Sequence, residues 1–205
     1  MLKDPVKVAV LVSGGGTNLQ AILDCQERGE ITSGKVCLVI SDQKGAYALE
    51  RAASHGIPSM VITKKDCGSQ RAFEEKIDLA LRDHGIGLVV LAGFLSILSE
   101  DFTSRYPEKI INIHPSLIPS FCGKGFYGLR VHEAALEKGV KVSGATVHFV
   151  NEIPDGGRII FQKAVEVMEG DTPEELQARI MREAEWKILP KAVEKVCSDM
   201  LKEER

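Results

Sequence analysis

The chain lacks the features that mark three broad classes of protein. Basic residues do not exceed acidic ones (26 Lys and Arg against 29 Asp and Glu), and the net charge of −3 disfavours a protein that binds nucleic acid through bulk charge. Aromatic residues make up only 5% of the sequence, too few for a base-stacking surface. No apolar run approaches the ~20 residues of a membrane-spanning helix. We therefore expect small-molecule partners, with neither nucleic acid nor a membrane among them.

Disulfide and metal-binding patterns are also missing. The five cysteines form no C-x-x-C pair, and their odd number disfavours a complete disulfide framework. His114, His132 and His148 are 18 and 16 residues apart, and no H-E-x-x-H or paired Cys/His spacing occurs, so no metal site is expected. The first residues show no basic, apolar and small-residue signal pattern. These observations favour a protein of the reducing cytoplasm.

What the chain does contain is an alternation of strand-like and helix-like segments. Hydrophobic residues make up 44% and charged residues 27%, the composition of a globular protein. Strands are predicted at residues 6–12, 35–41, 58–63, 88–92 and 109–113, and helices at 17–28, 46–55 and 69–84 separate the first four. Such alternation is typical of βαβ units. It predicts an α/β fold with an open, mostly parallel twisted sheet and helices on both faces.

The pattern changes after residue 114. A stretch rich in proline and glycine covers residues 115–128 and precedes a predicted helix at 131–138. Two further strands, at 142–150 and 158–167, flank an Asp-Gly-Gly turn and predict an antiparallel extension of the sheet. The last helix, at 173–200, has Thr172 as its predicted N-cap, and Pro190 is expected to kink or break it. Neither a repeat nor a linker divides the chain, so residues 1–205 are predicted to form a single domain.

The first candidate site is the sequence S-G-G-G-T-N-L-Q at residues 13–20, between a predicted strand and a predicted helix. Glycines allow the backbone to approach an anion, and the N-terminus of a helix offers free N–H groups. Neither the G-x-G-x-x-G nor the G-K-[ST] pattern is present, which favours a monophosphate over a dinucleotide or a triphosphate. The alternative interpretation is a tight turn without a ligand, and the candidates for the phosphate are then Lys124 and Arg130 in the second glycine-rich stretch.

The second candidate site is I-N-I-H-P at residues 111–115. Asn112 and His114 are two residues apart, so on a strand their side chains share one face. They lie at the carboxyl end of a predicted parallel strand, where open α/β sheets bind ligands. An amide and an imidazole side by side can stabilise an oxyanion. The alternative is a hydrogen-bonded pair that ends the strand.

Asp155, in I-P-D-G-G, is the third candidate. Its carboxylate can orient the imidazole of His114 and raise its pKa, provided that the fold brings the two together. The alternative is a turn residue, because Asp followed by two glycines suits a turn. His148, on the preceding strand, is expected to be either a packed histidine or one that supports the site residues from behind.

These motifs together carry a resemblance that covers nearly the whole chain. S-G-G-G-T-N-L-Q, L-A-G-F-L-S-I-L, I-N-I-H-P-S-L-I-P and V-H-F-V-N-E-I-P-D-G-G stand in the order and spacing of the phosphoribosylglycinamide formyltransferase family. The resemblance implies transfer of a formyl group from 10-formyltetrahydrofolate, the co-substrate, to the amine of glycinamide ribonucleotide. It also implies a single formyltransferase domain, without a metal, as a monomer or a homodimer.

The resemblance further assigns roles to individual residues. Asn112, His114 and Asp155 are the implied catalytic residues, with protonated His114 and Asn112 stabilising an oxyanion and Asp155 keeping the imidazole protonated. Gly16, Thr17 and Asn18 are implied to bind the substrate phosphate, and Glu185 its ribose. The implied folate-binding residues are Leu95, Ser96, Ile97, Leu98, Asn112, Asn151, Glu152, Ile153, Pro154 and Asp155, with Gln70 or Arg71 in addition.

Several positions depart from the pattern of the family. Some members have Met-Arg in place of Leu95-Ser96, and some have Arg in place of Gln70. Residues 120–130 replace a commoner version containing Pro-Gly and are expected to form a loop over the site. Two alternative functions are a formyltetrahydrofolate hydrolase, which has no need of a phosphate anchor, and a non-catalytic protein that binds phosphosugars.

Overall fold

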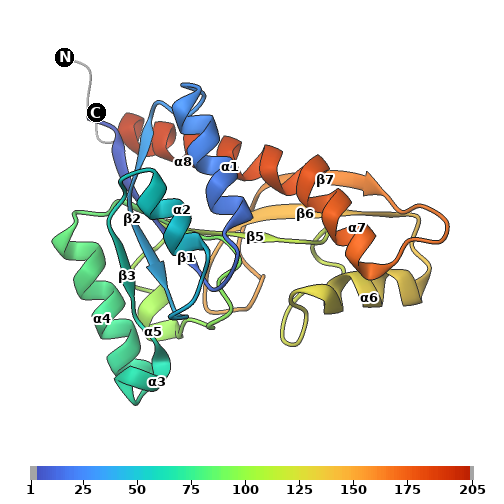
Figure 1. The fold of residues 1–205 in the computed structure, drawn as a ribbon, viewed down its shortest axis with the longest axis horizontal. Helices are drawn as coiled ribbons and strands as arrows, with labels where there is room; N and C mark the ends of the chain where they lie inside the picture. Colours follow the sequence, from blue (N-terminus) through green and yellow to red (C-terminus); the bar gives the residue numbers. More distant parts are fainter. Residues whose placement is uncertain (1–3, 204–205) are drawn as a thin grey trace.

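The computed structural model describes residues 4–203, which form a seven-stranded sheet in the order β3-β2-β1-β4-β5-β6-β7 (Figure 1). The strands are β1 (Val6–Val12), β2 (Gly34–Ser41), β3 (Ser59–Val61), β4 (Leu88–Leu91), β5 (Ile110–His114), β6 (Val142–Phe149) and β7 (Ile159–Glu166). β1 to β5 pair in parallel, whereas β6 and β7 are antiparallel. The predicted fold class is confirmed, including its antiparallel extension.

Helices cover both faces of this sheet (Figure 1). They are α1 (Thr17–Glu27), α2 (Ala48–Ser54), α3 (Lys64–Cys67), α4 (Gln70–Asp83), α5 (Glu100–Thr103), α6 (Leu129–Lys138), α7 (Pro173–Ile180) and α8 (Trp186–Glu203), with a π-helical turn, η1 (Met181–Glu185), between the last two. Within residues 4–203, no helix is both long and apolar enough to cross a membrane.

Alternate residues of β1 explain why both faces are covered. Val8, Val10 and Val12 belong to one buried cluster together with apolar residues of α1, α2, α7 and α8. Ala9 and Leu11, which point the other way, belong to a second cluster with α4 and α5. A strand that is apolar on both sides therefore needs a helical layer on each, as expected for parallel sheets.

The chain reverses its direction of travel across the sheet between β1 and β4. From β1 it proceeds to β2 and β3 on one side, and after β4 it proceeds to β5 and beyond on the other. The loops that follow β1 and β4 diverge at such a point and leave a crevice at the carboxyl ends of the strands. Ser13 connects these two loops, because its N–H donates to the Gly93 carbonyl at 3.1 Å and its Oγ accepts from the Leu95 N–H at 2.8 Å.

Two short helices, α3 and α5, were not among the predicted elements. Each is a single turn that begins at a capping side chain: Thr63 Oγ1 accepts from the Asp66 N–H, and Ser99 Oγ accepts from the Phe102 N–H. A single turn has no apolar periodicity, so local capping rather than a repeating pattern defines it. β5 also extends one residue further than predicted, and His114 is thus a strand residue.

The prediction that Pro190 breaks the last helix was wrong. Pro190 is buried inside α8, which continues to Glu203. The irregularity lies upstream in η1, where the Trp186 N–H bonds to the Met181 carbonyl, five residues back. Gln177, Met181 and Glu185 all line one cavity. In a regular α-helix, residues eight positions apart, such as Gln177 and Glu185, point about 80° away from each other around the helix axis. The wider π turn reduces this angle, so that both side chains face the same cavity.

Phe73 connects the core to the site, so its removal tests the packing described above. Its fully buried ring stacks on Phe94, which lines the cavity, with a centroid distance of 6.5 Å. We expect Phe73→Ala to lower the free energy of unfolding by about 3–5 kcal/mol, because a large side chain is lost from a closed core. Urea denaturation measures this value, and a loss below about 1 kcal/mol would contradict the packing.

Candidate active site

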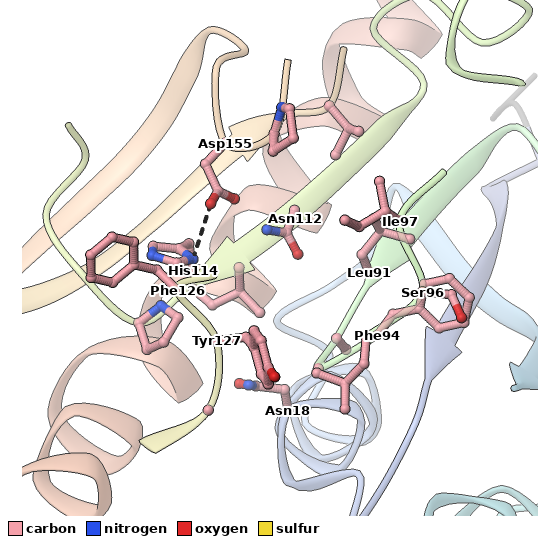
Figure 2. Close-up of a pocket in the computed structure, with 18 of the residues that line it drawn as sticks. Asn18, Leu91, Phe94, Ser96, Ile97, Asn112, His114, Phe126, Tyr127 and Asp155 are labelled. Carbon is pink, nitrogen blue, oxygen red and sulfur yellow. Dashed lines mark ion pairs between the residues drawn. The ribbon is translucent and has the colours of Figure 1, made fainter. Parts of the chain in front are cut away.

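A cavity of about 920 Å³ lies at the carboxyl ends of β1, β4 and β5, within the size range of small-molecule sites (Figure 2). Its walls come from segments that are far apart in the sequence. They are residues 14–18, 91–98, 112–115, 123–128, 148, 150–155, 177, 181 and 185. The structure therefore brings together the glycine loop, the Asn112 and His114 strand end, and Asp155.

The glycine loop leads directly into α1. Gly16 is the N-cap and has a left-handed backbone (φ 70°, ψ 30°), and no side chain caps the helix. A Cβ atom at Gly16 would lie 2.6 Å from the Cβ of Ala48, so packing against α2 excludes a side chain as well. Arg51, on α2, fixes the loop by a hydrogen bond from its Nε to the Gly15 carbonyl at 2.8 Å. The N–H groups at the start of α1 are thus left without a side-chain acceptor beside the cavity.

Asn18 and Glu185 form a buried polar pair in the cavity wall. Asn18 Nδ2 donates to Glu185 Oε2 at 2.6 Å, and Asn18 Oδ1 is buried with no partner among the described residues. Burial raises the pKa of Glu185 to about 7, although the hydrogen bond from Asn18 acts in the opposite direction. The pair offers an unsatisfied acceptor and a carboxyl group to a polar ligand.

Asn112 faces a histidine on the neighbouring strand. The antiparallel register places Asn112 opposite His148, and Asn112 Nδ2 lies 3.2 Å from His148 Nε2. His148 Nδ1 lies 2.7 Å from the carbonyl of Phe149, which can only accept, so this nitrogen carries the proton. In the neutral tautomer His148 Nε2 then accepts from Asn112, and the second amide N–H of Asn112 remains for a ligand.

Asp155 contacts groups from three segments. Its Oδ2 accepts from the Gly123 N–H at 2.8 Å and lies 3.6 Å from His114 Nδ1, while its Oδ1 lies 3.4 Å from His148 Nε2 (Figure 2). Burial acts to raise the pKa of Asp155, but the two histidines and the Gly123 N–H outweigh it, and the pKa lies below its ordinary value. The carboxyl group is therefore ionised at neutral pH.

His114 is buried, and its two ring nitrogens have different partners. Nε2 lies 2.9 Å from the Phe121 carbonyl, so we infer that Nε2 carries the proton and that Nδ1 faces Asp155. Burial lowers the pKa of His114 below 6.5; Asp155 raises it, but by less. The predicted effect of Asp155 on the pKa of His114 thus has the expected sign, and burial outweighs it. In the free protein at neutral pH, His114 Nδ1 is a proton acceptor.

The predicted folate-binding residues form an apolar rim and the floor near it. Leu95, Ile97 and Ile153 line the cavity and are 61%, 65% and 58% exposed. Together they expose apolar surface to water at one site, and a ligand that covers them would remove this surface from water. Ser96, Leu98, Asn151, Glu152 and Pro154 also line it. Ser96 Oγ donates to Asp42 at 2.6 Å, which gives this side chain a protein partner instead of a ligand.

Gln70 and Arg71 are not among the residues that line the cavity. Gln70 Nε2 donates to Glu74 at 2.6 Å and to the Ile97 carbonyl at 3.0 Å, so it supports the rim from outside. Arg71 forms an exposed i,i+4 ion pair with Glu75. Both positions belong to the first turn of α4. Direct folate contact at Gln70 or Arg71 stays a prediction.

Several lining residues were not predicted as site residues, and Lys124 was predicted only as an alternative phosphate ligand. Lys124, Phe126 and Tyr127 come from the loop that was expected to cover the site, but its length and composition do not show which side chains face inward. Gln177 and Met181 join Glu185 through η1. Within residues 4–203, no group of three or more His, Cys, Asp or Glu side chains is arranged to hold a metal.

The buried Glu185 makes stability depend on pH in a defined direction. Folding raises its pKa from 4.5 to about 7, so the folded protein holds this proton more tightly than the unfolded chain. Stability from this group is complete below pH 4.5 and is lost as the pH rises toward 7, by at most about 1.4 kcal/mol per unit. We expect Glu185→Gln to gain stability relative to the wild type over this window.

Urea denaturation at several pH values measures the difference between the two proteins. Glu183→Gln, at an exposed position two residues away, is the matched control and should follow the wild type. Parallel curves for Glu185→Gln and the wild type would show that Glu185 is not held in a raised state.

Comparison with known proteins agrees with the geometry of the cavity. A family model described as formyl transferase matches residues 6–193. The chloroplastic phosphoribosylglycinamide formyltransferase of Arabidopsis thaliana is 41% identical over 198 residues, which cover 96% of this chain and 67% of that protein. The human trifunctional purine biosynthetic protein adenosine-3 is 45% identical, with coverage of 96% and 19%. The chain thus corresponds to only a part of the trifunctional protein.

The fold is also similar to that of solved structures. Glycinamide ribonucleotide transformylase 1 from Symbiobacterium toebii superposes with a TM-score of 0.90 at 42% identity, covering 97% of this chain and 90% of that one. The match extends over the elements that surround the cavity as well as the rest of the sheet. The chain belongs to the formyl transferase family.

Proposed function

We propose that residues 1–205 form a single formyltransferase domain of de novo purine biosynthesis. It transfers the formyl group of 10-formyltetrahydrofolate to the primary amine of 5'-phosphoribosylglycinamide. One observation carries the proposal: a single cavity is lined both by the uncapped N-terminus of α1 and by Asn112, His114 and Asp155. The names of the relatives supply the substrate class.

The phosphate end of the amine substrate binds at the glycine loop. Backbone N–H groups of Gly16, Thr17 and Asn18 donate to phosphate oxygens, and the positive end of the α1 dipole favours the charge. Glu185 and the free Oδ1 of Asn18 accept hydrogen bonds from ribose hydroxyls. With the phosphosugar bound at this end, its amine points toward β5 and the catalytic residues. Binding of the phosphate thus orients the amine for attack and lowers the entropic cost of the reaction.

The formyl donor occupies the side of the cavity formed by residues 95–98 and 151–155. A flat ring between the exposed side chains of Leu95, Ile97 and Ile153 removes apolar surface from water. Backbone groups of these two segments supply polar contacts, since Ser96 is already bonded to Asp42. A cavity of about 920 Å³ has room for a bulky ligand of this kind beside the sugar.

Proton transfer is the task of His114. The amine attacks the formyl carbon and forms a tetrahedral adduct with an oxyanion and a protonated nitrogen. Neutral His114 accepts that proton at Nδ1 and returns it to the departing folate nitrogen as the carbon–nitrogen bond breaks. While it is protonated, Asp155 stabilises the imidazolium across the 3.6 Å separation. The free N–H of Asn112 donates to the oxyanion.

The hydrolase alternative replaces the amine with water. Water requires neither a phosphate anchor nor the Asn18 and Glu185 pair, both of which border the same cavity. These features favour the amine as acceptor. A non-catalytic phosphosugar-binding protein would have no use for an Asp155 that faces both His114 and His148, with Asn112 beside His148.

The proposal predicts that deformylation of the folate depends on the amine. We expect the absorbance change of 10-formyltetrahydrofolate only when glycinamide ribonucleotide is present, with one formylated amine formed for each folate deformylated. Equal rates with and without the amine would identify a hydrolase instead. Absence of any turnover, with glycinamide ribonucleotide still raising the melting temperature, would identify a binding protein.

His114→Ala tests the assignment of the proton acceptor. We expect kcat to fall about 10²–10⁴-fold, because the proton path is lost while the phosphate contacts remain. The dissociation constant for glycinamide ribonucleotide should change little. His84→Ala, at the C-cap of α4, is the control and should keep wild-type activity. Near-normal turnover by His114→Ala would remove this residue from the mechanism.

A further inference from the structure

Lys124 stands apart in the charge distribution of the cavity. Among the described residues that line it, Lys124 is the only lysine or arginine, whereas Glu152, Asp155 and Glu185 contribute carboxyl groups. Lys124 forms no hydrogen bond or ion pair within residues 4–203, and its side chain is exposed. A free ammonium group on a wall that is otherwise acidic is suited to an anionic ligand.

The backbone places Lys124 at the tip of a tight turn. The Phe126 N–H donates to the Gly123 carbonyl at 3.1 Å, which makes Lys124 and Gly125 the two central residues. Gly125 has a φ of +97°, the conformation that a type II turn requires at its third position. A Cβ atom at Gly125 would have no neighbour within 4 Å, so the glycine serves the backbone conformation rather than packing.

The start of this turn is attached to the proposed catalytic residues. The Gly123 N–H donates to Asp155 Oδ2 at 2.8 Å, and the Phe121 carbonyl accepts from His114 Nε2 at 2.9 Å. Phe121 and Phe126 pack edge to face, with their ring centroids 6.4 Å apart. Lys124 is thereby carried on a turn whose position is set by the same side chains that perform the chemistry.

The other end of the turn reaches toward α1. Tyr127 projects toward Asn18 in Figure 2, and both residues line the cavity. Arg130 lies over the Tyr127 ring at 5.0 Å and restrains it from outside. Leu91, Phe94 and Ile97 lie across the cavity from this loop (Figure 2). Lys124 thus lies in the chain between Gly123, which is bonded to Asp155, and Tyr127, which points toward Asn18 (Figure 2).

We propose that Lys124 binds the phosphate of the amine substrate together with the N-terminus of α1, which lines the same cavity, and so selects phosphorylated over unphosphorylated amines. This inference rests on the proposed function and adds a specificity-determining residue to it. The helix N-terminus supplies only about half a unit charge. A phosphate dianion that enters a cavity with three carboxyl groups gains from a full positive charge, and no other lysine or arginine of the described chain lines that cavity.

The test compares Lys124→Met, which removes the charge, with Lys124→Arg, which keeps it. Lys124→Met should raise the KM for glycinamide ribonucleotide about tenfold or more and change kcat and the KM for the folate less than twofold. Lys124→Arg should restore most of the affinity. Lys76→Met, at an exposed position on α4, is the matched control and should behave as the wild type.

An amine substrate without the phosphate, glycinamide riboside, separates a phosphate contact from a general defect. The wild type and Lys124→Met should use the riboside with equal kcat/KM. An unchanged KM for the ribonucleotide, or an equal loss for both amines, would overturn the proposal. A rise in the KM for the folate alone would overturn it as well, since Lys124 would then serve the carboxylates of the folate.

A binding measurement tests Lys124 separately from the proposed reaction. Calorimetric titration with inorganic phosphate should show binding to the wild type that weakens in Lys124→Met and returns in Lys124→Arg. Equal binding to wild type and Lys124→Met would overturn the assignment. A wild type that binds phosphate through Lys124 but formylates no glycinamide ribonucleotide would contradict the proposed reaction and leave the anion site standing.

Discussion

The carboxylate of Asp155 is the contact on which the organisation of the site depends. One oxygen receives the Gly123 N–H and faces His114, and the other faces His148. These three partners come from a loop, from β5 and from β6. Asp155 itself has a left-handed backbone (φ 56°), a conformation that costs energy for a residue with a side chain. The hydrogen bond from the Gly123 N–H to its carboxylate offsets part of that cost, and protonation of either histidine adds a favourable ion pair.

The sheet explains how these partners come within reach of one another. The parallel half directs the ends of β1, β4 and β5 to one edge, where the chain reverses its order across the sheet. The antiparallel strand β6 then runs beside β5 and sets His148 opposite Asn112. A parallel strand at this position would require a long crossover connection and would place its own loop elsewhere. The mixed sheet thus brings the uncapped N-terminus of α1 and a histidine pair to the same cavity.

Local patterns in the sequence predict the fold and the motifs, but not the contacts between distant segments. The alternation of apolar strands and helices is visible over windows of about ten residues, and Asn112 and His114 share a strand face because their spacing is two. The pairing of Asn112 with His148 depends on a strand register that no local window contains. Glu185 reaches the cavity through a π turn, whereas the helical pattern predicts a regular helix up to Pro190 and places the irregularity at the proline.

The direction of the His114 pKa shows a second limit of reasoning from sequence. The charge of a nearby carboxylate was foreseen, whereas the extent of burial is a property of the folded core. In the structure burial acts more strongly than Asp155 on this imidazole. Similarly, the composition of residues 120–130 indicates a loop, and only the fold shows that Lys124, Phe126 and Tyr127 line the cavity while Gln70 and Arg71 do not.

The most direct test of this account is an NMR titration of the His114 imidazole in the wild type and in Asp155→Asn, with the resonances assigned by their loss in His114→Ala. The account predicts that at neutral pH the proton is on Nε2 and Nδ1 is free. The pKa should lie below 6.5 in the wild type and fall further in Asp155→Asn, because the negative charge that opposes burial is gone. A wild-type pKa above 6.5, or a proton on Nδ1 instead of Nε2, would contradict the account, as would an unchanged pKa in Asp155→Asn.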